Sequence, residues 1–410
     1  MKKVYHLLFF LYFSVTLLAQ TELRVSPKTT DSAIDDWLED NYIFINKNVP
    51  QMGKLVILLP GSGLNPSSYL LILRSAANRG YNVIGLKYPN TFSLAELCSK
   101  STDSSCYEKV RLEVLDGTDR TQLVSVSRAN SLENRLSKLL IYMKENYSEG
   151  QWDLFLKPDK TPEWSNIIVI GHSLGGGMAA IMAQRYYILR VVMLASPTDY
   201  SDYFNRPAFY LGKPHLTPSS HYFGFGHKKD AIVRYEEIWK LLGMDQFGPL
   251  INVDTTLPPY LGTHMLSTGM NPPESDYHGS VAMDLTTPKN QDGSPVFSRV
   301  WEYMAYPVQI LDRAEKPPEL AGGYSLGQNY PNPFNPATNI TFRIPAEVHV
   351  RLSVVNVLGN EIAVLLNEEM PAGEHTVRFN AGAHSLTAGV YFFRISAGSF
   401  YSIKKMVLLK

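Results

Sequence analysis

A short apolar run that leads straight into a turn of small residues constrains the fold of this chain more than any other feature. Residues 167–170, Ile-Ile-Val-Ile, are continuously apolar, as expected for a strand covered on both faces of a parallel sheet. The turn that follows, residues 171–175, reads Gly-His-Ser-Leu-Gly, and the Ala- and Met-rich residues after it favour a helix. A strand, a sharp turn and a helix in direct succession predict an α/β architecture with Ser173 at the apex of the turn.

The same alternation of apolar strands and amphipathic helices extends over residues 32–308. The strand candidates are wholly or nearly apolar, and they are residues 42–45, 55–59, 81–86, 167–170, 191–195, 221–225 and 264–267. Two apolar stripes at helical spacing are predicted to face the core. One belongs to a helix that begins at Asn130 with Glu133 as its reciprocal capping residue, and the other runs from Ile232 to Leu242. We therefore expect a mostly parallel sheet flanked by helices.

Residues 89–128 interrupt this alternation with a long, polar stretch that holds Cys98 and Cys106. A stretch of this length predicts an excursion from the sheet, either a cap over a site or a surface loop. Two cysteines in the whole chain exclude zinc-finger frameworks, iron–sulfur clusters and disulfide-dense scaffolds. The pair either forms a disulfide or remains as two buried thiols that pack like small apolar groups.

Residues 1–19 predict a signal peptide. Lys2 and Lys3 precede an apolar run that ends at Ala19, and the run is shorter than the roughly 20 residues that a membrane-spanning helix needs. The alternative is a membrane anchor, but no later segment is as apolar, so we expect an exported mature form without a transmembrane segment. An oxidising compartment permits the Cys98–Cys106 disulfide.

Charge gives little indication of a macromolecular partner. The 38 Lys and Arg residues balance the 38 Asp and Glu residues, so the chain has no net field that would attract nucleic acid. We expect no nucleic-acid partner. A length of 410 residues is too great for one ordinary domain, which predicts two folded domains.

The Gly-x-Ser-x-Gly turn predicts a nucleophile at Ser173, whose hydroxyl needs a base to take its proton. In this strand–turn–helix context the acid and then the base follow the serine in the chain. Asp230, in a loop after a predicted strand, is the expected acid, with Asp199 as the alternative. His278, in a loop, is the expected base, whereas His264 lies in a strand-like run and is better interpreted as a sheet histidine.

A tetrahedral intermediate also needs donors for its oxyanion. The small residues 60–63, Pro-Gly-Ser-Gly, follow a predicted strand, so the expected donors are the backbone amides of Ser62 and Leu174, with Gly63 as the substitute for Ser62. A phosphate-binding loop is a weak alternative because no Gly-Lys-Ser/Thr follows. His172 and His227 are predicted to be neighbours that shape the pocket. We expect no cofactor and no metal.

Residues 55–304 resemble the α/β-hydrolase superfamily, and residues 171–175 are the most specific part of the match. The resemblance implies acyl transfer through a covalent acyl-enzyme. The roles it implies are Ser173 as nucleophile, His278 as base, Asp230 as the carboxylate that orients the base, and the amides of Ser62 and Leu174 as oxyanion donors. Many members carry His-Gly at the oxyanion turn, whereas this chain has Pro60-Gly61.

The composition changes after Ala314. Residues 20–314 form the predicted catalytic domain, residues 315–323 a Pro- and Gly-rich linker, and residues 324–410 a second domain with alternating apolar and polar residues and frequent turns. This pattern predicts a small antiparallel β-sandwich without a catalytic constellation. Residues 326–338, 358–360, 372–375, 388–391 and 404–410 resemble the C-terminal sorting domain of type IX secretion cargo. The resemblance implies an outer-membrane translocon as partner, with release or surface attachment afterwards.

Together these features predict a secreted or cell-surface serine hydrolase that acts on a small-molecule or polymer-borne carboxylic ester. The first alternative is a peptidase or amidase of the same fold. The second is a non-catalytic surface binding protein, which would keep Ser173, Asp230 and His278 out of hydrogen-bond reach of one another.

Overall fold

The computed structural model describes residues 20–232, 234–306, 324–356, 360–384, 386–398 and 400–409. The chain divides into two compact units, Met1–Pro307 and Val308–Lys410, which are described separately below. The predicted signal peptide, residues 1–19, and the predicted linker, residues 315–323, lie outside the described residues. The domain boundaries expected from the sequence stay a prediction.

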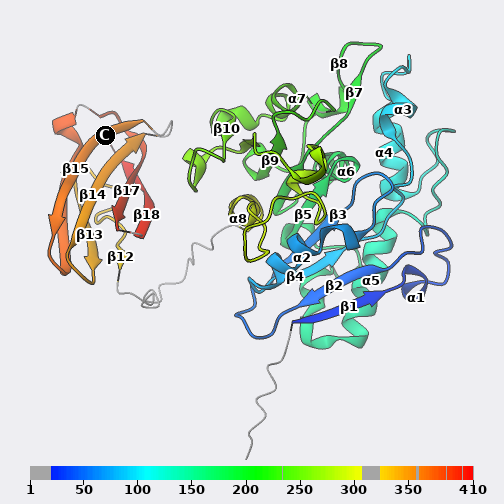
Figure 1. The fold of residues 1–410 in the computed structure, drawn as a ribbon, viewed down its shortest axis with the longest axis horizontal. Coiled ribbons are helices and arrows are strands. Elements are labelled where there is room, and N and C mark those ends of the chain that lie inside the picture. The colour runs from blue at the N-terminus through cyan, green and yellow to red at the C-terminus, as the bar shows by residue number, and fades with distance from the viewer. Residues whose placement is uncertain are drawn as a thin grey trace, which may run out of the picture. The chain divides into compact units, whose positions relative to one another are not determined.

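The N-terminal unit is built on a nine-stranded sheet with the order β1-β2-β4-β3-β5-β6-β9-β11-β10 (Figure 1). Its strands are β1 (Thr21–Val25), β2 (Asn41–Ile45), β3 (Leu55–Leu59), β4 (Asn82–Gly85), β5 (Ile167–His172), β6 (Arg190–Leu194), β9 (Tyr222–His227), β10 (Ile251–Asn252) and β11 (Met265–Thr268). β2 pairs antiparallel with β1 and with β4, whereas the other pairings are parallel. The predicted α/β fold with a mostly parallel sheet is thus confirmed.

The seven predicted strands correspond to observed strands within a residue or two at each end. β1 and β10 were not predicted, because β1 carries charged residues at alternate positions and β10 contains only Ile251 and Asn252. A separate two-stranded hairpin consists of β7 (Tyr200–Ser201) and β8 (Arg206–Pro207).

Helices cover both faces of the sheet, as Figure 1 shows. They are α1 (Pro27–Thr30), α2 (Leu70–Ala77), α3 (Leu94–Cys98), α4 (Cys106–Asp116), α5 (Leu132–Asn146), α6 (Leu174–Arg185), α7 (Tyr235–Leu241) and α8 (Ser298–Ala305). Alternate residues of β3 point to opposite faces. Leu55 and Ile57 belong to the apolar core that includes α4, α5 and α6, whereas Val56 and Leu58 belong to the core that includes α2 and α8. In the part of the chain that the structure describes, no helix is long and apolar enough to span a bilayer.

Two details of the predicted helices were wrong. α5 begins at Leu132, and its cap is Ser131, whose Oγ accepts a hydrogen bond from the amide of Asn134 at 3.4 Å. Glu133 does not cap the helix but forms an ion pair with Arg128. α7 begins only at Tyr235, so Ile232 lies before the helix and is 61% exposed instead of packed in the core.

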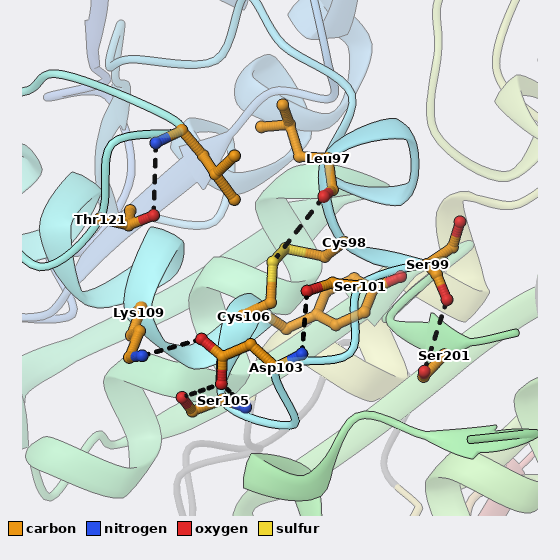
Figure 2. Close-up of a disulfide and its surroundings, with 12 residues drawn as sticks. Leu97, Cys98, Ser99, Ser101, Asp103, Ser105, Cys106, Lys109, Thr121 and Ser201 are labelled. Carbon is orange, nitrogen blue, oxygen red and sulfur yellow. Dashed lines mark hydrogen bonds and ion pairs between the residues drawn. A yellow bond between two sulfur atoms is a disulfide. The ribbon is translucent and has the colours of Figure 1, made fainter. Parts of the chain in front are cut away.

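The polar excursion at residues 89–128 is part of the helical layer and not only a surface loop. It forms α3 and α4, and α4 packs against α5 and α6 through buried residues such as Val110 and Val114. The Cys98–Cys106 disulfide is present and joins the end of α3 to the start of α4 (Figure 2). The β7–β8 hairpin packs beside it, since the Ser201 hydroxyl donates to the carbonyl of Ser99 at 3.4 Å.

The C-terminal unit consists of two antiparallel sheets. One contains β12 (Ser325–Leu326), β13 (Ala337–Ile344) and β16 (Gly373–Asn380), and the other contains β15 (Glu361–Met370), β14 (Val348–Asn356), β17 (Gly389–Ala397) and β18 (Phe400–Leu408). Inward-facing residues of both sheets, such as Phe342 and Phe393, share one apolar core. The predicted antiparallel β-sandwich is confirmed.

Candidate active site

Ser173 lies at the point where β5 ends and α6 begins, in a backbone conformation that few residues other than glycine adopt. Its φ is 54° and its ψ is −118°. A Cβ at Gly171 would lie 2.2 Å from the carbonyl oxygen of Gly175, and one at Gly175 would lie 2.0 Å from the carbonyl oxygen of Leu59. Both glycines are therefore required by close backbone approaches, and the strained turn projects the serine from the carboxyl edge of the sheet.

Three side chains from three different loops meet at this edge. The Nε2 atom of His278 lies 2.8 Å from the Oγ atom of Ser173, and its Nδ1 atom lies 2.7 Å from Oδ2 of Asp230. With Nδ1–H donating to the carboxylate, Nε2 is left without a proton and accepts the hydrogen bond of the serine hydroxyl. The structure thus brings together the residues expected as nucleophile, base and acid.

The carboxylate of Asp230 is held by donors from its own loop and from the start of α7. The amide of Ile232 donates to Oδ1 at 2.9 Å, and the hydroxyl of Tyr235 donates to Oδ2. Burial opposes ionisation of this group, but the hydrogen bonds from His278, Tyr235 and Ile232 outweigh that effect and keep the pKa of Asp230 below its ordinary value. Asp230 therefore remains ionised next to His278.

The contact of Tyr235 with Asp230 is not predicted from the sequence, in which Tyr235 belongs only to an apolar helical stripe. Burial raises the pKa of its hydroxyl well above the ordinary value, so the group stays protonated and donates. A Cβ at Gly226 in β9 would lie 2.4 Å from the Tyr235 ring. The signal in the sequence was therefore a glycine inside a strand, which marks the close approach of a neighbouring group.

Asp199, the alternative acid, lies in a different environment. It is fully buried and pairs with Arg111, whose Nε donates to Oδ2 at 2.5 Å, and the hydroxyl of Tyr210 donates to the same oxygen at 2.7 Å. Arg111 also donates from Nη1 to the carbonyl oxygen of Leu174 at 3.0 Å. Asp199 is thus engaged in an ion pair that supports the start of α6, and it is not brought to His278.

Two further histidines, His264 and His227, are held by contacts away from the Ser173 hydroxyl. The ring of His264 is stacked between Phe223 and Phe247, with centroid distances of 4.0 and 4.1 Å, and lies apart from Ser173. His227 accepts from the amide of Lys229 and bonds the carbonyl of Met270, so it joins two loops and does not line the serine cavity. Its ring contacts that of Tyr277, next to His278, at a centroid distance of 4.7 Å, so the expectation that His227 shapes the pocket stays a prediction.

His172 does line the cavity, and it connects the loop after β3 with the loop that carries His278. The amide of Gly61 donates to the Tyr69 hydroxyl at 3.0 Å, this hydroxyl lies 2.9 Å from Nδ1 of His172, and Nε2 of His172 lies 3.2 Å from the carbonyl oxygen of His278. Burial, followed by the charge of His278, lowers the pKa of His172 to about 3. A neutral ring with the proton on Nε2 satisfies all of these bonds.

The loop of residues 60–63 lies against the nucleophile, since a Cβ at Gly61 would be 3.2 Å from the Cβ of Ser173. The amide of Gly63 is already engaged, because it donates to the carbonyl oxygen of Asn90 at 2.7 Å. Within the described residues, the amides of Ser62 and Leu174 have no hydrogen-bond acceptor. Both amides are therefore free to donate to a ligand, whereas the amide of Gly63 is not.

A cavity of about 410 Å³ opens at Ser173 and His278. A larger one of about 570 Å³ is lined by residues 35–39 and Thr91 and contains none of these groups. In the described ranges, no cluster of three or more His, Cys, Asp or Glu side chains is arranged to hold a metal ion. The smaller cavity thus brings together the hydroxyl of Ser173, the imidazole of His278 with its partner Asp230, and two free amide donors.

Comparison with known proteins identifies the C-terminal unit. Residues 328–409 match the family model of the secretion system C-terminal sorting domain. No curated protein matches the chain. A likeness exists to the crystal structure of TT1662 from Thermus thermophilus, with a TM-score of 0.33 and 11% identity over 62% of this chain and 88% of that chain.

A second likeness is to an acetyl xylan esterase from Aspergillus awamori, with a TM-score of 0.37 and 14% identity over 69% of this chain and 98% of that chain. At these TM-scores and identities neither structure indicates an activity for this chain. Residues 328–409 are a type IX secretion C-terminal sorting domain, which makes the chain an exported, secreted or cell-surface protein.

Proposed function

We propose that the N-terminal unit is a serine hydrolase that cleaves carboxylic esters through an acyl-enzyme intermediate. The observation that carries the proposal is the unbroken hydrogen-bonded series from Ser173 through His278 to Asp230, with distances of 2.8 and 2.7 Å. Such a series activates a hydroxyl that is otherwise a poor nucleophile. A non-catalytic binding protein has no need for it.

In the first half of the reaction, Oγ of Ser173 attacks the carbonyl carbon of the ester while Nε2 of His278 takes the hydroxyl proton. The negative charge that develops on the carbonyl oxygen accepts hydrogen bonds from the amides of Ser62 and Leu174. Leu174 is the first residue of α6, so the helix N-terminus also favours this charge. The tetrahedral intermediate then collapses, and the alcohol leaves with the proton from Nε2.

In the second half, a water molecule attacks the acyl carbon and gives a proton to Nε2 of His278. Collapse of the second tetrahedral intermediate releases the carboxylic acid, and Oγ of Ser173 recovers its proton from Nε2. Throughout, the ionised Asp230 holds Nδ1–H in place and stabilises the imidazolium that forms twice in each cycle. His278 thus takes up a proton and gives it back in each half of the reaction, while Ser173 is the nucleophile in the first half and the leaving group in the second.

The test is labelling of the purified mature protein with a fluorophosphonate probe, followed by hydrolysis of a panel of esters and of amides with the same acyl groups. We expect labelling and ester hydrolysis, and we expect Ser173→Ala and His278→Ala each to lower kcat about 10⁴-fold or more while the circular dichroism spectrum is unchanged. His264→Ala is the matched control and should retain activity.

Two outcomes would contradict the proposal. Unchanged turnover of Ser173→Ala would exclude Ser173 as nucleophile. Turnover of the amides with higher kcat/KM than the matched esters would favour the peptidase or amidase alternative instead.

A further inference from the structure

The cavity at Ser173 has one charged side chain among its described lining residues outside the catalytic series, and it is a carboxylate. Asp276 lies in the same loop as His278 and lines the cavity together with it. No Lys or Arg side chain is among the lining residues that the structure describes. Outside the catalytic series, the side-chain charge that the described lining residues offer to a bound group is therefore negative.

The carboxylate of Asp276 is not neutralised by its surroundings. In the described ranges it takes part in no ion pair, and its hydrogen bond comes from the neutral amide of Gly279, which donates to Oδ1 at 2.9 Å. Lys229, which lies over the ring of Tyr277 at 5.3 Å, donates to Asn271 and is not among the residues that line the cavity. No Lys or Arg side chain among the described lining residues therefore offsets the negative charge of Asp276 toward a bound group.

The rest of the cavity wall is mostly apolar and comes from separate parts of the chain. The apolar lining residues are Leu64, Leu94, Ala95, Leu174, Ile232 and Met283. An apolar wall excludes water and lowers the local dielectric, so a charge–charge repulsion is stronger here than at an open surface. An anionic substrate group would lose hydration and meet Asp276, whereas an uncharged group would gain apolar contact.

We propose that this cavity selects uncharged esters and that Asp276 is the residue that rejects anionic ones. The inference rests on the proposed ester hydrolysis at Ser173 and adds the substrate class. The same repulsion assists release of the carboxylate product, which becomes anionic as it forms next to Asp276.

The experiment compares two acetyl esters that are nearly identical in shape: 4-acetoxybenzamide, which is neutral, and 4-acetoxybenzoate, which is anionic. Values of kcat/KM are divided by the rate of alkaline hydrolysis of each ester. We expect the wild type to prefer the neutral ester by about ten-fold or more. Asp276→Asn, which keeps an oxygen for the Gly279 amide, should remove most of this preference by improving hydrolysis of the anionic ester.

Two controls separate a local effect from net charge. Asp276→Glu keeps the carboxylate and should keep the preference. Asp245→Asn changes the net charge by the same amount at an exposed position outside the cavity and should also leave the preference unchanged. If Asp276→Asn does not fold, the wild type is measured with and without about 1 M salt. Because salt screens the charge of Asp276, the difference in normalised kcat/KM between the two esters should become smaller.

The possible results test ester hydrolysis and the selection by Asp276 separately. Hydrolysis of neither ester would overturn the proposed function itself. Equal normalised hydrolysis of both by the wild type, or an Asp276→Asn variant that discriminates as strongly as the wild type, would overturn the inference and leave ester hydrolysis standing.

Discussion

Asp199 and Asp230 follow the neighbouring strands β6 and β9, but their side chains have different hydrogen-bond partners. Asp230 accepts a hydrogen bond from the imidazole of His278, whereas Asp199 accepts hydrogen bonds from Arg111 and Tyr210. An ion pair buried this deeply is strongly destabilised when one partner is removed, because the other charge is left without compensation. At the scale of single residues, the two carboxylates therefore support different properties of the protein.

Substitution of each aspartate by asparagine separates these properties. We expect Asp199→Asn to lower the free energy of unfolding by about 3 to 5 kcal/mol, because Arg111 stays buried and loses its counter-charge. We expect Asp230→Asn to lower kcat about 10⁴-fold with a smaller loss of stability, because His278 loses its orienting carboxylate. Denaturant unfolding and ester turnover measure both effects. A fully active Asp230→Asn variant would reassign the acid.

A second prediction at this scale concerns pH and His172. The folded state holds the pKa of His172 at about 3, while the unfolded chain binds a proton below about pH 6.5. The unfolded state therefore binds more protons between these values, and the stabilising effect of the neutral ring, complete above about pH 6.5, is lost as the pH falls toward about 3. The free energy of unfolding therefore falls with decreasing pH, and His172 contributes at most about 1.4 kcal/mol per pH unit to this change.

Unfolding experiments on the wild type and on His172→Gln across this pH range measure that contribution. His215 and His264, whose pKa values burial also lowers to about 4 each, titrate in the same direction in both proteins and cancel in the comparison. We expect the stability advantage of the wild type at neutral pH to shrink with acidification. A constant difference between pH 7 and pH 4 would contradict the neutral buried ring.

At the scale of elements, the excursion at residues 89–128 supplies part of the cavity wall. Leu94 and Ala95 at the start of α3 line the cavity, and Cys98 at the end of this short helix is joined to Cys106 at the start of α4. α4 in turn packs against α5 and α6. The disulfide thus couples a five-residue helix, too short to be stable alone, to the main helical layer.

Removal of this disulfide should weaken both stability and substrate binding. In the chain-entropy treatment, a closed loop of this length contributes roughly 2 to 3 kcal/mol. We expect the double variant Cys98→Ala, Cys106→Ala to lose about this amount and to show a raised KM with a smaller change in kcat, since α3 lines the cavity but not the reacting atoms. Mass spectrometry under non-reducing conditions checks the bond in the exported protein, and two free thiols there would contradict it.

At the scale of the whole molecule, the two units have separate apolar cores and separate tasks. Every residue proposed for catalysis belongs to the N-terminal unit, whereas the sorting domain at residues 328–409 belongs to the C-terminal unit. A domain with its own core folds as a unit, and a translocon can recognise it without any contribution from the active site. Export and hydrolysis should therefore be separable.

Two truncations test this separation. Residues 20–314 alone should fold and hydrolyse esters with kcat/KM close to that of the full-length protein, because no C-terminal residue belongs to the proposed site. Deletion of residues 324–410 in the native host should leave active enzyme in the periplasm, which cell fractionation with an esterase assay detects. Loss of activity in the first protein would mean that the sandwich supports the catalytic unit, and normal export of the second would contradict its role as the export signal.

The features that the sequence determined by itself are those that depend on neighbours in the chain. An apolar run followed by Gly-x-Ser-x-Gly specifies the strand, the turn and the helix around Ser173 because the steric requirement for Gly171 and Gly175 is local. Alternation with period two specified the sandwich in the same way. The sequence also placed Asp230 and His278 in loops at the carboxyl edge of the sheet, which is why the structure brings them to Ser173.

Only the tertiary structure decided which of several similar groups lie together at Ser173. Nothing near Asp199 in the chain indicates that Arg111, 88 residues away, forms an ion pair with it. Nothing near Gly63 indicates that its amide donates a hydrogen bond to the carbonyl oxygen of Asn90. The hydroxyl of Tyr235 and the uncompensated charge of Asp276 are recognised only when the cavity and its neighbours are assembled. Hydrogen bonds and charges act through space, so their partners depend on the packing of distant segments, whereas turns and strands depend on the residues next to them.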